Sequence, residues 1–420
     1  MTKKKESWIQ KHSYQIRVMI SQSTARYTSD LAYGILPVLI AFHYGEWFAG
    51  LFFGVLNLIQ AYLGHPIAGN TADRIGSKPT MLIGLGSMLT SALIWIFLPM
   101  NNIFVIIIFG LFFFISYSFR QTDEIYFLRM SSKKEGGAVF GLSESFYCLA
   151  RFFSTISIPF FILSGNQYMA AWIMLAGVAI NFYGVASVPN DPIKNSSLKS
   201  FGASMNPLIA IKGGWSFVKK NKGYPLMILS NNLFEGFFYG TIWFVFPLHI
   251  AAMNSVGFLN GLTLGIYEVV FAITAFYFGY LADRYNWRFF HSFGWIIIAL
   301  GIIALPIFED PIWLIIVGVV IALGNSLSNF AADHAFTQYD IDHREDGAFV
   351  AMKNIVNDTG YALAPLIAGF LYFAYGFKVS LYATMILSVL ITIWMVWLTW
   401  KTEKEELKPK RSKEIKKGAI

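Results

Sequence analysis

Charged side chains are scarce in this chain of 420 residues, and their scarcity excludes a soluble globular protein of ordinary composition. Asp, Glu, Lys and Arg make up 13% of the residues, whereas hydrophobic residues make up 56%. In soluble domains about a quarter of the residues are charged, because their surface faces water. Forty Phe, 21 Tyr and 12 Trp add to the apolar excess. The composition therefore indicates a chain whose solvent is the lipid bilayer.

Patterns for disulfides, metals and nucleotides are missing as well. The single cysteine, Cys148, excludes a disulfide within the chain. The seven histidines lack metal-ligand spacing, and no glycine-rich loop ends in the Lys-Ser or Lys-Thr of a phosphate-binding loop. We therefore expect no metal, no cofactor and no ATP-driven pumping by this chain. Asp333 and His334, with His343 nearby, are the only hint of an intramembrane enzyme.

Long apolar runs are what the chain has instead. A helix that crosses the hydrocarbon core needs about 20 mostly apolar residues. We expect the first run to remain as a span, because it is too long for a signal peptide and lacks a small-residue cleavage site. The sequence predicts twelve spans, at 18–43, 47–68, 79–99, 103–128, 137–163, 168–188, 224–249, 255–278, 289–308, 311–335, 347–373 and 378–400.

The basic residues predict how these spans are oriented. Of the 32 Lys and Arg, 27 lie in the two ends and in the connections on one side of the twelve-span arrangement, whereas only Lys378 lies on the other side. Basic residues mark the cytoplasmic side of membrane proteins. We therefore expect an integral protein of the cell membrane with both termini cytoplasmic, and its formal net charge of +8 does not point to nucleic acid.

The longest polar connection divides the chain into two halves. It is rich in Pro, Gly, Ser and Lys, and it contains one short amphipathic stretch at 207–220. The predicted organisation is an N-terminal six-helix bundle at 1–188, a cytoplasmic linker at 189–223, a C-terminal six-helix bundle at 224–400 and a basic cytoplasmic tail at 401–420.

The two halves match when the sequence is shifted by 210 residues. No gap is needed between Pro37 and Ala138, and each single match is weaker evidence than the shared offset. Six plus six spans joined by a cytoplasmic linker imply two bundles related by an axis along the membrane normal. The matched pairs include Pro37 and Pro247, Gly69 and Gly279, Asp73 and Asp283, Asp123 and Asp333, and Ala138 and Ala348.

One pattern of charges is repeated at this offset. Residues 69–79 read GNTADRIGSKP, and residues 279–288 read GYLADRYNWR. The first copy resembles the Gly-x-Leu-Ala-Asp-Arg-x-Gly-Arg-Lys turn of the major facilitator superfamily, with Thr71 in place of Leu and Ser77 in place of the middle Arg. The second copy lacks the internal glycine. Together with the span count and the duplication, the resemblance covers the whole chain and implies an all-α transporter of two pseudo-symmetric six-helix bundles.

The resemblance also implies that these residues hold the cytoplasmic side shut and release it when the carrier opens inward. The glycines allow helices to approach closely, and the charges face helix ends or pair across the seam between the halves. The alternative is that they are turn residues which follow the basic bias, and the second copy favours the gate. The predicted gate residues are Gly69, Asp73, Arg74, Lys78, Asp123, Gly279, Asp283, Arg284, Arg288 and Asp333.

Ionisable groups inside the predicted spans are the candidates for substrate binding and coupling, because a charge at bilayer depth is unfavourable without a role. Buried, unpaired carboxyl groups exchange protons near neutral pH. The alternative for each acid is an ion pair with Arg26, Arg151 or Lys353 of another helix, and Arg26 and Asp30 also form a possible pair within one helix. The candidates are Arg26, Asp30, Glu144, Arg151, Glu235, Glu268, Asn357 and Asp358.

The expected function is secondary active transport of a small organic solute by alternating access, coupled to protons. The alternative is a multidrug/proton antiporter, although the fifth span reads LARFFSTISIPFF and lacks the Gly-Pro-rich signature of such exporters. An intramembrane enzyme and a receptor with a transporter fold are more distant alternatives. The expected partners are the solute, protons and the bilayer, with no nucleic acid, and we expect a monomer.

Overall fold

The computed structural model describes residues 11–44, 46–131, 136–163, 167–191, 207–220, 224–252, 258–307, 311–337 and 346–417. Within these residues all regular secondary structure is helical. Helices suit a chain in lipid because each backbone N–H and C=O finds its partner inside the same segment. The prediction of an all-α protein is therefore confirmed for the described part of the chain.

The first half of the chain forms one bundle of helices that run back and forth. A short π-helix and a break at Gln121–Thr122 interrupt two of its passes. The elements are α2 (Ser13–Tyr44), α3 (Glu46–Ile59), the π-helix η1 (Gln60–Gly64), α4 (His65–Ile75), α5 (Ser77–Phe97), α6 (Ile103–Arg120), α7 (Asp123–Met130), α8 (Gly136–Leu163) and α9 (Gln167–Ala186).

The second half forms the other bundle, preceded by a helix in the predicted linker. This helix, α11 (Pro207–Lys220), has the bounds that the sequence predicts, and it packs against α4 and α16. The remaining elements are α12 (Tyr224–Ala252), α13 (Phe258–Arg284), α14 (Trp287–Ala304), the 3₁₀ turn η2 (Leu305–Ile307), α15 (Pro311–Thr337) and α16 (Asp346–Lys417).

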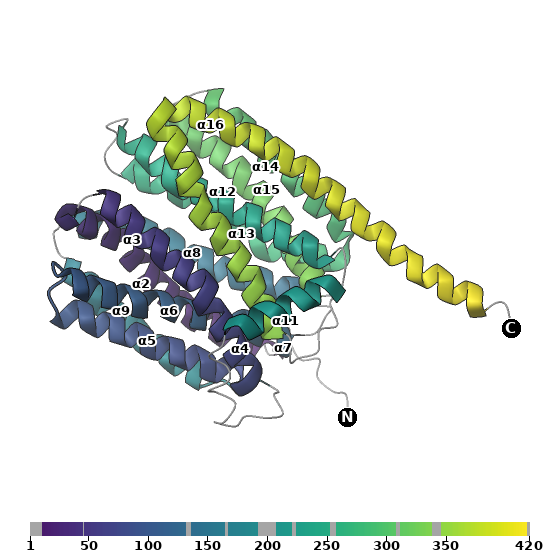
Figure 1. Ribbon diagram of the computed structural model, residues 1–420, viewed down its shortest axis with the longest axis horizontal. Helices are drawn as coiled ribbons and strands as arrows, with labels where there is room; N and C mark the ends of the chain where they lie inside the picture. The colour runs from purple at the N-terminus through teal and green to yellow at the C-terminus, as the bar shows by residue number, and fades with distance from the viewer. Residues whose placement is uncertain are drawn as a thin grey trace, which may run out of the picture.

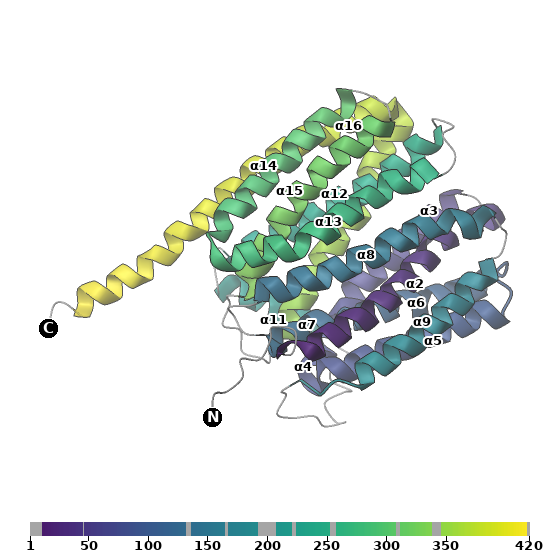
Figure 2. The same cartoon turned by 180° about the vertical axis from the view of Figure 1, so that it is seen from behind.

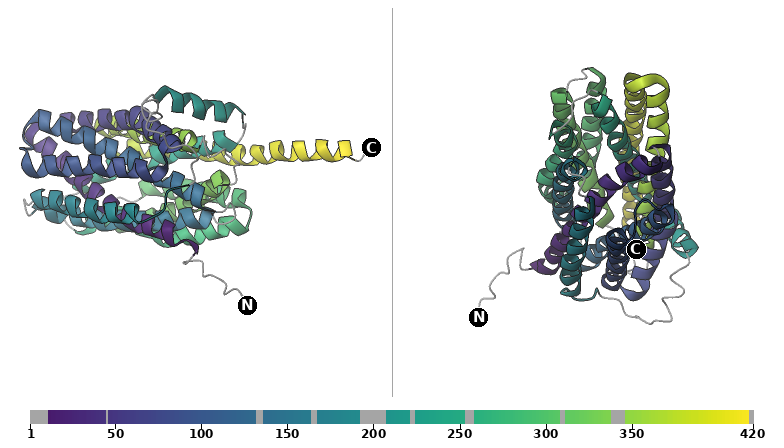
Figure 3. Two further views of the ribbon diagram at one scale, coloured as in Figure 1. Left: turned by 90° about the horizontal axis from the view of Figure 1, so that it is seen from below. Right: turned by 90° about the vertical axis from the view of Figure 1, so that its left-hand side faces the viewer.

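The two bundles lie side by side along their length (Figures 1 and 2). Helix α8 of the first bundle packs against α13 of the second, and α4 packs against α16. We call the end that holds the α4–α5 turn and the α13–α14 turn the motif end. Helix α2 begins there, and the last part of α16 projects beyond the bundles from the same end (Figures 1 and 3).

Large apolar side chains fill the interior of each bundle. Trp95 and Phe109 belong to a core cluster of the first bundle, and Trp295 and Ile298 belong to a second cluster that also includes residues of the first half. A smaller apolar cluster lies where α8 meets α13 and α15, and is formed by Cys148, Phe271, Ala272, Ala275 and Phe330. The two bundles are thus packed bodies that share a seam.

Hydropathy confirms seven of the predicted spans among the described residues, and the other five stay predictions. Four of these five contain charged candidates, as expected for helices that face the interior between the bundles. The seven segments are Ser77–Phe97, Ile103–Met130, Tyr168–Ala186, Gly265–Arg284, Trp287–Ile307, Ile312–Ala335 and Leu381–Thr402.

One glycine separates the last two predicted spans, which otherwise form a single long helix. Gly376 has a φ of 81°, a conformation that L residues with a Cβ rarely adopt, and it lies between the predicted spans at 347–373 and 378–400. After this break α16 continues to Lys417, so most of the predicted basic tail is helical.

Candidate functional site

The first copy of the repeated pattern lies on the last turns of one helix and the first turn of the next. Gly69, which is buried, and Asp73 belong to α4, which continues to Ile75, and Ser77 opens α5. Only Gly76 separates the two helices, with a φ of 102°. Glycine adopts this conformation without a Cβ clash, so the end of α4 and the start of α5 are held close together.

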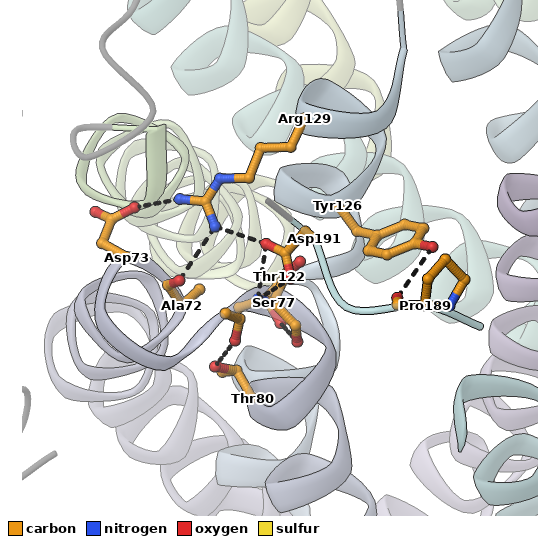
Figure 4. A network of polar contacts seen from close by, with 10 residues as sticks. Ala72, Asp73, Ser77, Thr80, Thr122, Tyr126, Arg129, Pro189 and Asp191 are labelled. Atoms are coloured by element: carbon orange, nitrogen blue, oxygen red, sulfur yellow. Dashed lines mark hydrogen bonds and ion pairs between the residues drawn. The ribbon is translucent and has the colours of Figure 1, made fainter. Parts of the chain in front are cut away.

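Arg129 of α7 is the centre of the polar contacts around this turn (Figure 4). Its Nη2 donates to Asp73 Oδ1 at 2.8 Å, and its Nη1 donates to Asp191 Oδ2 at 2.8 Å and to the carbonyl oxygen of Ala72 at 3.1 Å. The Arg129 side chain is fully enclosed. Such a guanidinium is stable in the interior because charged and polar acceptors surround it.

Asp191 connects Arg129 to the N-terminus of α5. The backbone N–H of Ser77 donates to both of its carboxylate oxygens, at 3.0 and 3.1 Å. Burial alone would raise the pKa of Asp191, but the hydrogen bonds from Arg129 and Ser77 hold the pKa below its ordinary value. A charged carboxylate at the positive end of α5 therefore ties the segment after α9 to the turn.

The other two charges of the first copy bind elsewhere. Lys78 Nζ donates to the carbonyl oxygens of Ala186 at 2.9 Å and Val188 at 2.6 Å, where α9 ends. A cation is favourable at this negative end of a helix. Arg74 Nε donates to Asn70 Oδ1 at 3.3 Å within α4. Lys78 thus fixes α9 to α5, whereas this bond of Arg74 stays within its own helix.

The second copy makes a contact between the bundles. One oxygen of Asp283, near the end of α13, accepts a hydrogen bond from the backbone N–H of Ala138 at 2.9 Å, and the other lies 2.7 Å from His334 Nδ1 of α15. Gly279 is buried one turn earlier on the same helix. Since Ala138 lies in the first turn of α8, the Asp283 carboxylate faces a positive helix end in the other bundle.

The two arginines of the second copy stack on aromatic rings. The Arg284 guanidinium lies 4.3 Å from the centre of the Tyr280 ring, and the Arg288 guanidinium lies 4.8 Å from the centre of the Trp287 ring. Both are cation–π contacts. The assignment of these arginines to the gate stays a prediction.

A lysine of α16 bridges two acids near the motif end. Lys353 Nζ lies 3.3 Å from Glu124 Oε2 of α7 and 3.3 Å from Asp333 Oδ1 of α15. The Glu124 pair joins the two bundles. Asp123, the sequence counterpart of Asp333, instead accepts a hydrogen bond from the hydroxyl of Tyr147 inside the first bundle. Asp123 and Asp333, which match at the repeat offset, therefore have different surroundings.

Further from the motif end, Arg151 of α8 joins three helices. Its Nη1 lies 3.1 Å from Glu268 Oε1 of α13, and its Nε lies 3.6 Å from Asp30 Oδ2 of α2. Arg26 Nε lies 3.8 Å from the same oxygen of Asp30. Glu268 is completely buried. For Asp30 and Glu268 the structure thus shows the alternative of an ion pair with an arginine of another helix.

Two further candidates near this ion-pair cluster have different surroundings. The Arg26 guanidinium lies 5.1 Å from the ring centre of Tyr117 and 5.7 Å from that of Tyr147, within the range of cation–π contacts. Glu144 makes no hydrogen bond or ion pair with any residue that the structure describes. The central acids therefore divide into arginine-paired groups and a group without such a contact in the described chain.

The candidates Glu235 of α12 and Asn357 of α16 form hydrogen bonds with neutral groups. Glu235 accepts a hydrogen bond from the side-chain amide of Asn329, whose oxygen accepts from Asn231 Nδ2 at 2.9 Å. Asn357 Nδ2 donates to the backbone carbonyl of Asn232 at 3.2 Å and so joins α16 to α12. These contacts lie within the second bundle.

Asp358 of α16 faces the first bundle. Its Oδ2 accepts a hydrogen bond from Gln60 Nε2 at 2.8 Å and lies 2.8 Å from His65 Nε2. Gln60 belongs to η1, and His65 is the first residue of α4. The acid therefore joins the eleventh predicted span to the second.

Several residues of these clusters were absent from the sequence-based candidates. Asp191 had a usable signal, because it is the only acidic residue between 189 and 223. Arg129 lay among the basic residues that define the cytoplasmic side, and nothing in its neighbourhood set it apart. The partners that the sequence did not identify are Arg129, Asp191, His65, His334 and Asn329.

Comparisons with known proteins agree with this geometry. A sequence profile of the Major Facilitator Superfamily matches residues 18–356. No curated protein matches the sequence. Solved structures similar to the chain include the human organic anion transporter MFSD10, with a TM-score of 0.75 and 15% identity over 93% of this chain and 99% of that one.

Two further transporters have the same fold. The proton:xylose symporter XylE has a TM-score of 0.72 and 12% identity, covering 93% of this chain and 95% of that one. A bacterial homologue of the iron transporter ferroportin, in an outward-facing state, has a TM-score of 0.68 and 12% identity, covering 93% and 99%. Identities this low establish the shared fold alone.

Proposed function

Because this chain belongs to the major facilitator superfamily, we propose that it is a secondary active transporter which moves a small organic solute across the cell membrane by alternating access, with protons as the coupling ion. The family and the fold are those of transporters and not of enzymes. To the family and the fold, the proposal adds three parts: the class of solute, the coupling to protons and the alternating movement of the two bundles.

The observation that carries the proposal is the ion pair between Arg151 and Glu268. It joins the two bundles at a place where Glu268 is fully buried. Moving the bundles apart along this seam would separate the pair and leave a carboxylate without its counter-charge. An unpaired buried charge is unfavourable by several kcal/mol, so opening requires a compensating proton, solute or water. Ion pairs that open and close in this way couple bundle movement to charged ligands.

The motif end supplies the second support. Asp283 with the N–H of Ala138, and Lys353 with Glu124, join the bundles there. These two charge-assisted contacts are stronger than neutral hydrogen bonds and favour the closed arrangement, yet each is a single contact that a working cycle can break. A carrier that opens to the cytoplasm must release them, as the proposed alternating access requires.

The proposed class of solute rests on the charged and aromatic side chains around Arg26 and Arg151 and on the transporters of similar structure. Arginines beside acids, with Tyr117 and Tyr147 stacked on Arg26, offer charged and aromatic contacts to a polar organic molecule. One neighbour is an organic anion transporter and another is a proton:xylose symporter, and both support a small organic solute. For the alternative of multidrug export we find no favouring contact among the described residues.

The proposal also covers the orientation of the chain in the membrane and its division into bundles, linker and tail. Helix α2 begins and α16 ends at the motif end (Figure 1), which the basic residues assign to the cytoplasm. We propose both termini on that side, bundles at 1–188 and 224–400, a linker at 189–223, a tail at 401–420, and a monomer as the working unit.

The test is transport by the purified protein in liposomes with an imposed pH gradient and a panel of organic anions, sugars and cationic drugs. We expect one solute class to accumulate with the gradient and to exchange without it. Arg151→Gln should reduce this flux at least about tenfold, because Glu268 and Asp30 both lose a cation, a change worth more than 1.4 kcal/mol. The charge-neutralising control is Lys401→Gln, at an exposed residue that stacks on Trp397, and it should leave the flux unchanged.

Arg151→Lys separates folding from function, because it keeps the charge and should recover part of the flux. No flux of any probe in any mode would overturn the proposal, and flux that ignores the pH gradient would overturn proton coupling. Accumulation of cationic drugs against the gradient would establish the efflux alternative. Chemical conversion of a probe without translocation would establish an intramembrane enzyme.

A further inference from the structure

A single π-helical turn interrupts the first bundle where it faces α16. Element η1 covers Gln60–Gly64, and the backbone N–H of His65 donates to the carbonyl of Gln60, five residues earlier. In an α-helix, positions five apart point about 140° away from each other, because each residue turns the chain by about 100°. The wider π turn, closed by a hydrogen bond between residues five apart, brings the directions of residues 60 and 65 closer together. Gln60 and His65 therefore point in the same direction.

The shared partner of these two side chains is Asp358. Both reach its Oδ2, each at 2.8 Å. The His65 side chain is 1% exposed and that of Asp358 is 16% exposed, so the pair is largely enclosed between the bundles. One position further along, the hydroxyls of Tyr62 and Thr359 lie 3.2 Å apart across the same seam. A local change of helix type thus delivers two polar groups to one acid of the other bundle.

The matched seam of the duplicated chain lacks this arrangement. Helices α8 and α16 begin at residues 136 and 346, which differ by 210, the offset of the sequence repeat. At this offset Asp358 corresponds to Cys148 and His65 corresponds to Ala275. Cys148 and Ala275 belong to the apolar cluster between α8 and α13, where α13 is α-helical throughout. Apolar side chains therefore suffice to pack the seam at the positions of Cys148 and Ala275. We infer that the polar residues at the matching positions, Asp358 and His65, have a task other than packing.

The type of partner distinguishes this acid from the other acids of the seam. Asp30 and Glu268 face Arg151, whose guanidinium stays charged. Asp358 instead faces an imidazole, which is the side chain most often used to bind and release a proton. Tyr33 of α2 and Tyr117 of α6 interact electrostatically with Asp358, and Tyr62 of η1 reaches the adjacent Thr359. Within five residues of Asp358 on α16 are Tyr361 and Lys353, which pairs with Glu124, and the neighbouring helix α11 carries the exposed Lys212.

We propose that His65 and Asp358 form a proton-binding site that holds one proton while the bundles are closed along this seam and releases it to water when the seam opens. The inference rests on the proposed proton coupling and names its site. With the proton bound, the imidazolium and the carboxylate are neutral as a pair, which suits an enclosed position. Without it, the pair keeps a net charge of −1, which an opened, hydrated seam solvates better. Loss of the proton therefore favours opening at the motif end.

The test needs no knowledge of the solute. Spin labels at Tyr183→Cys and Tyr285→Cys, two exposed positions on different bundles, report the separation of the motif ends in nanodiscs between pH 5 and 8.5. The background is Cys148→Ala. We expect the closed population to grow as the pH falls, because a proton that prefers the closed state about tenfold changes the closed-to-open ratio by up to about tenfold.

His65→Gln keeps a donor for Asp358 but cannot titrate, so it should flatten this response. The matched control is His291→Gln, at a fully buried histidine inside the second bundle, and it should respond like the parent. Asp358→Asn provides a second variant should the first fold poorly, and it should flatten the response as well.

An unchanged pH response in His65→Gln or Asp358→Asn would overturn the inference, as would a parent protein whose label distances ignore pH. Neither result touches the proposed transport, which depends on the flux measurements. Conversely, an absence of solute flux would overturn the proposed function whatever the labels report. The two failures are therefore distinguishable.

Discussion

The two copies of the repeated charge pattern occupy matching places in the two bundles but make different contacts. In the first copy, Arg129 binds Asp73 and Asp191 and so connects α7, α4 and the segment after α9 within one half of the protein (Figure 4). In the second copy, Asp283 reaches the N–H of Ala138 in the other half. The first set of contacts can persist when the bundles move apart, whereas the Asp283 contact must break.

The residues at the repeat offset explain this difference. Asp191 corresponds to Lys401, and Gly76 corresponds to Asn286. The second copy thus has a cation where the first has the acid that caps α5. Its Lys401 stacks on the Trp397 ring, with Nζ 4.7 Å from the ring centre. We infer that the first copy is a rigid support and the second a contact that opens, although both carry the same Ala-Asp-Arg sequence.

Removing the central cation of the first copy should have the largest effect on stability. Arg129→Ala leaves Asp73 and Asp191 without their shared counter-charge, and truncating one partner of a buried ion pair destabilises by about 3–5 kcal/mol. In the second copy, Arg284→Ala removes an exposed cation–π contact of about 0.5–1 kcal/mol. Thermal unfolding of the purified variants in detergent measures both. Equal losses of stability would contradict the assigned difference between the copies.

A smaller effect with a distinct pH dependence should follow from Asp191→Asn. The folded-state pKa of Asp191 lies below its ordinary value, so its contribution to stability is present above the unfolded-state pKa of about 3.9 and is lost as the pH falls through the folded-state pKa. The variant should lose about 1.5–3 kcal/mol at neutral pH, the worth of hydrogen bonds to a charged group.

Below about pH 3.9, the deficit of Asp191→Asn relative to the parent should shrink, because the parent then loses the same stabilisation. Unfolding midpoints from pH 7 down to about pH 2 measure this convergence. Lys212→Gln, at an exposed lysine of α11, is the charge-neutralising control and should parallel the parent at each pH. A constant deficit for Asp191→Asn would show that its carboxylate does not titrate in this range.

Much of the fold was predictable because the bilayer imposes simple rules on the sequence. Apolar runs of fixed length predicted the helices, and the single offset of 210 predicted two bundles, whereas the cytoplasmic side of the termini stays a prediction from the basic residues. The same offset reappears in the structure, where α5 and α14 begin at Ser77 and Trp287. These rules act on segments of about 20 residues, so they tolerate uncertainty about individual side chains.

The partners of the site residues were less predictable, because they depend on local geometry that the pattern does not encode. Asp358 was a sequence candidate, but its contact with His65 arises from a π turn that no composition rule predicts. Glu268 had no basic neighbour within four residues along its own helix, and its counter-ion Arg151 comes from the other bundle. The sequence thus located the charges inside the helices without pairing them.

The last predictions compare the backbone of the α4–α5 turn with that of the α13–α14 turn. Gly76→Ala forces a Cβ into a backbone conformation, with φ of 102° and ψ of 155°, that is essentially confined to glycine, and places it 3.1 Å from Asp191 Oδ1. The change should destabilise by about 1–3 kcal/mol. Asn286, its counterpart, has an ordinary φ of −68°, and its side chain accepts a hydrogen bond from the N–H of Arg288 at 3.1 Å. Asn286→Ala should therefore lose only the helix cap, about 1 kcal/mol.

Asn286→Gly should recover most of that loss, because glycine is also a favourable N-cap residue. Gly76→Asn should be less stable than the parent with Gly76, because the tight contact with Asp191 remains. Unfolding midpoints of the four variants measure these differences, and a Gly76→Ala protein as stable as its parent would show that the close contact at Asp191 relaxes without loss.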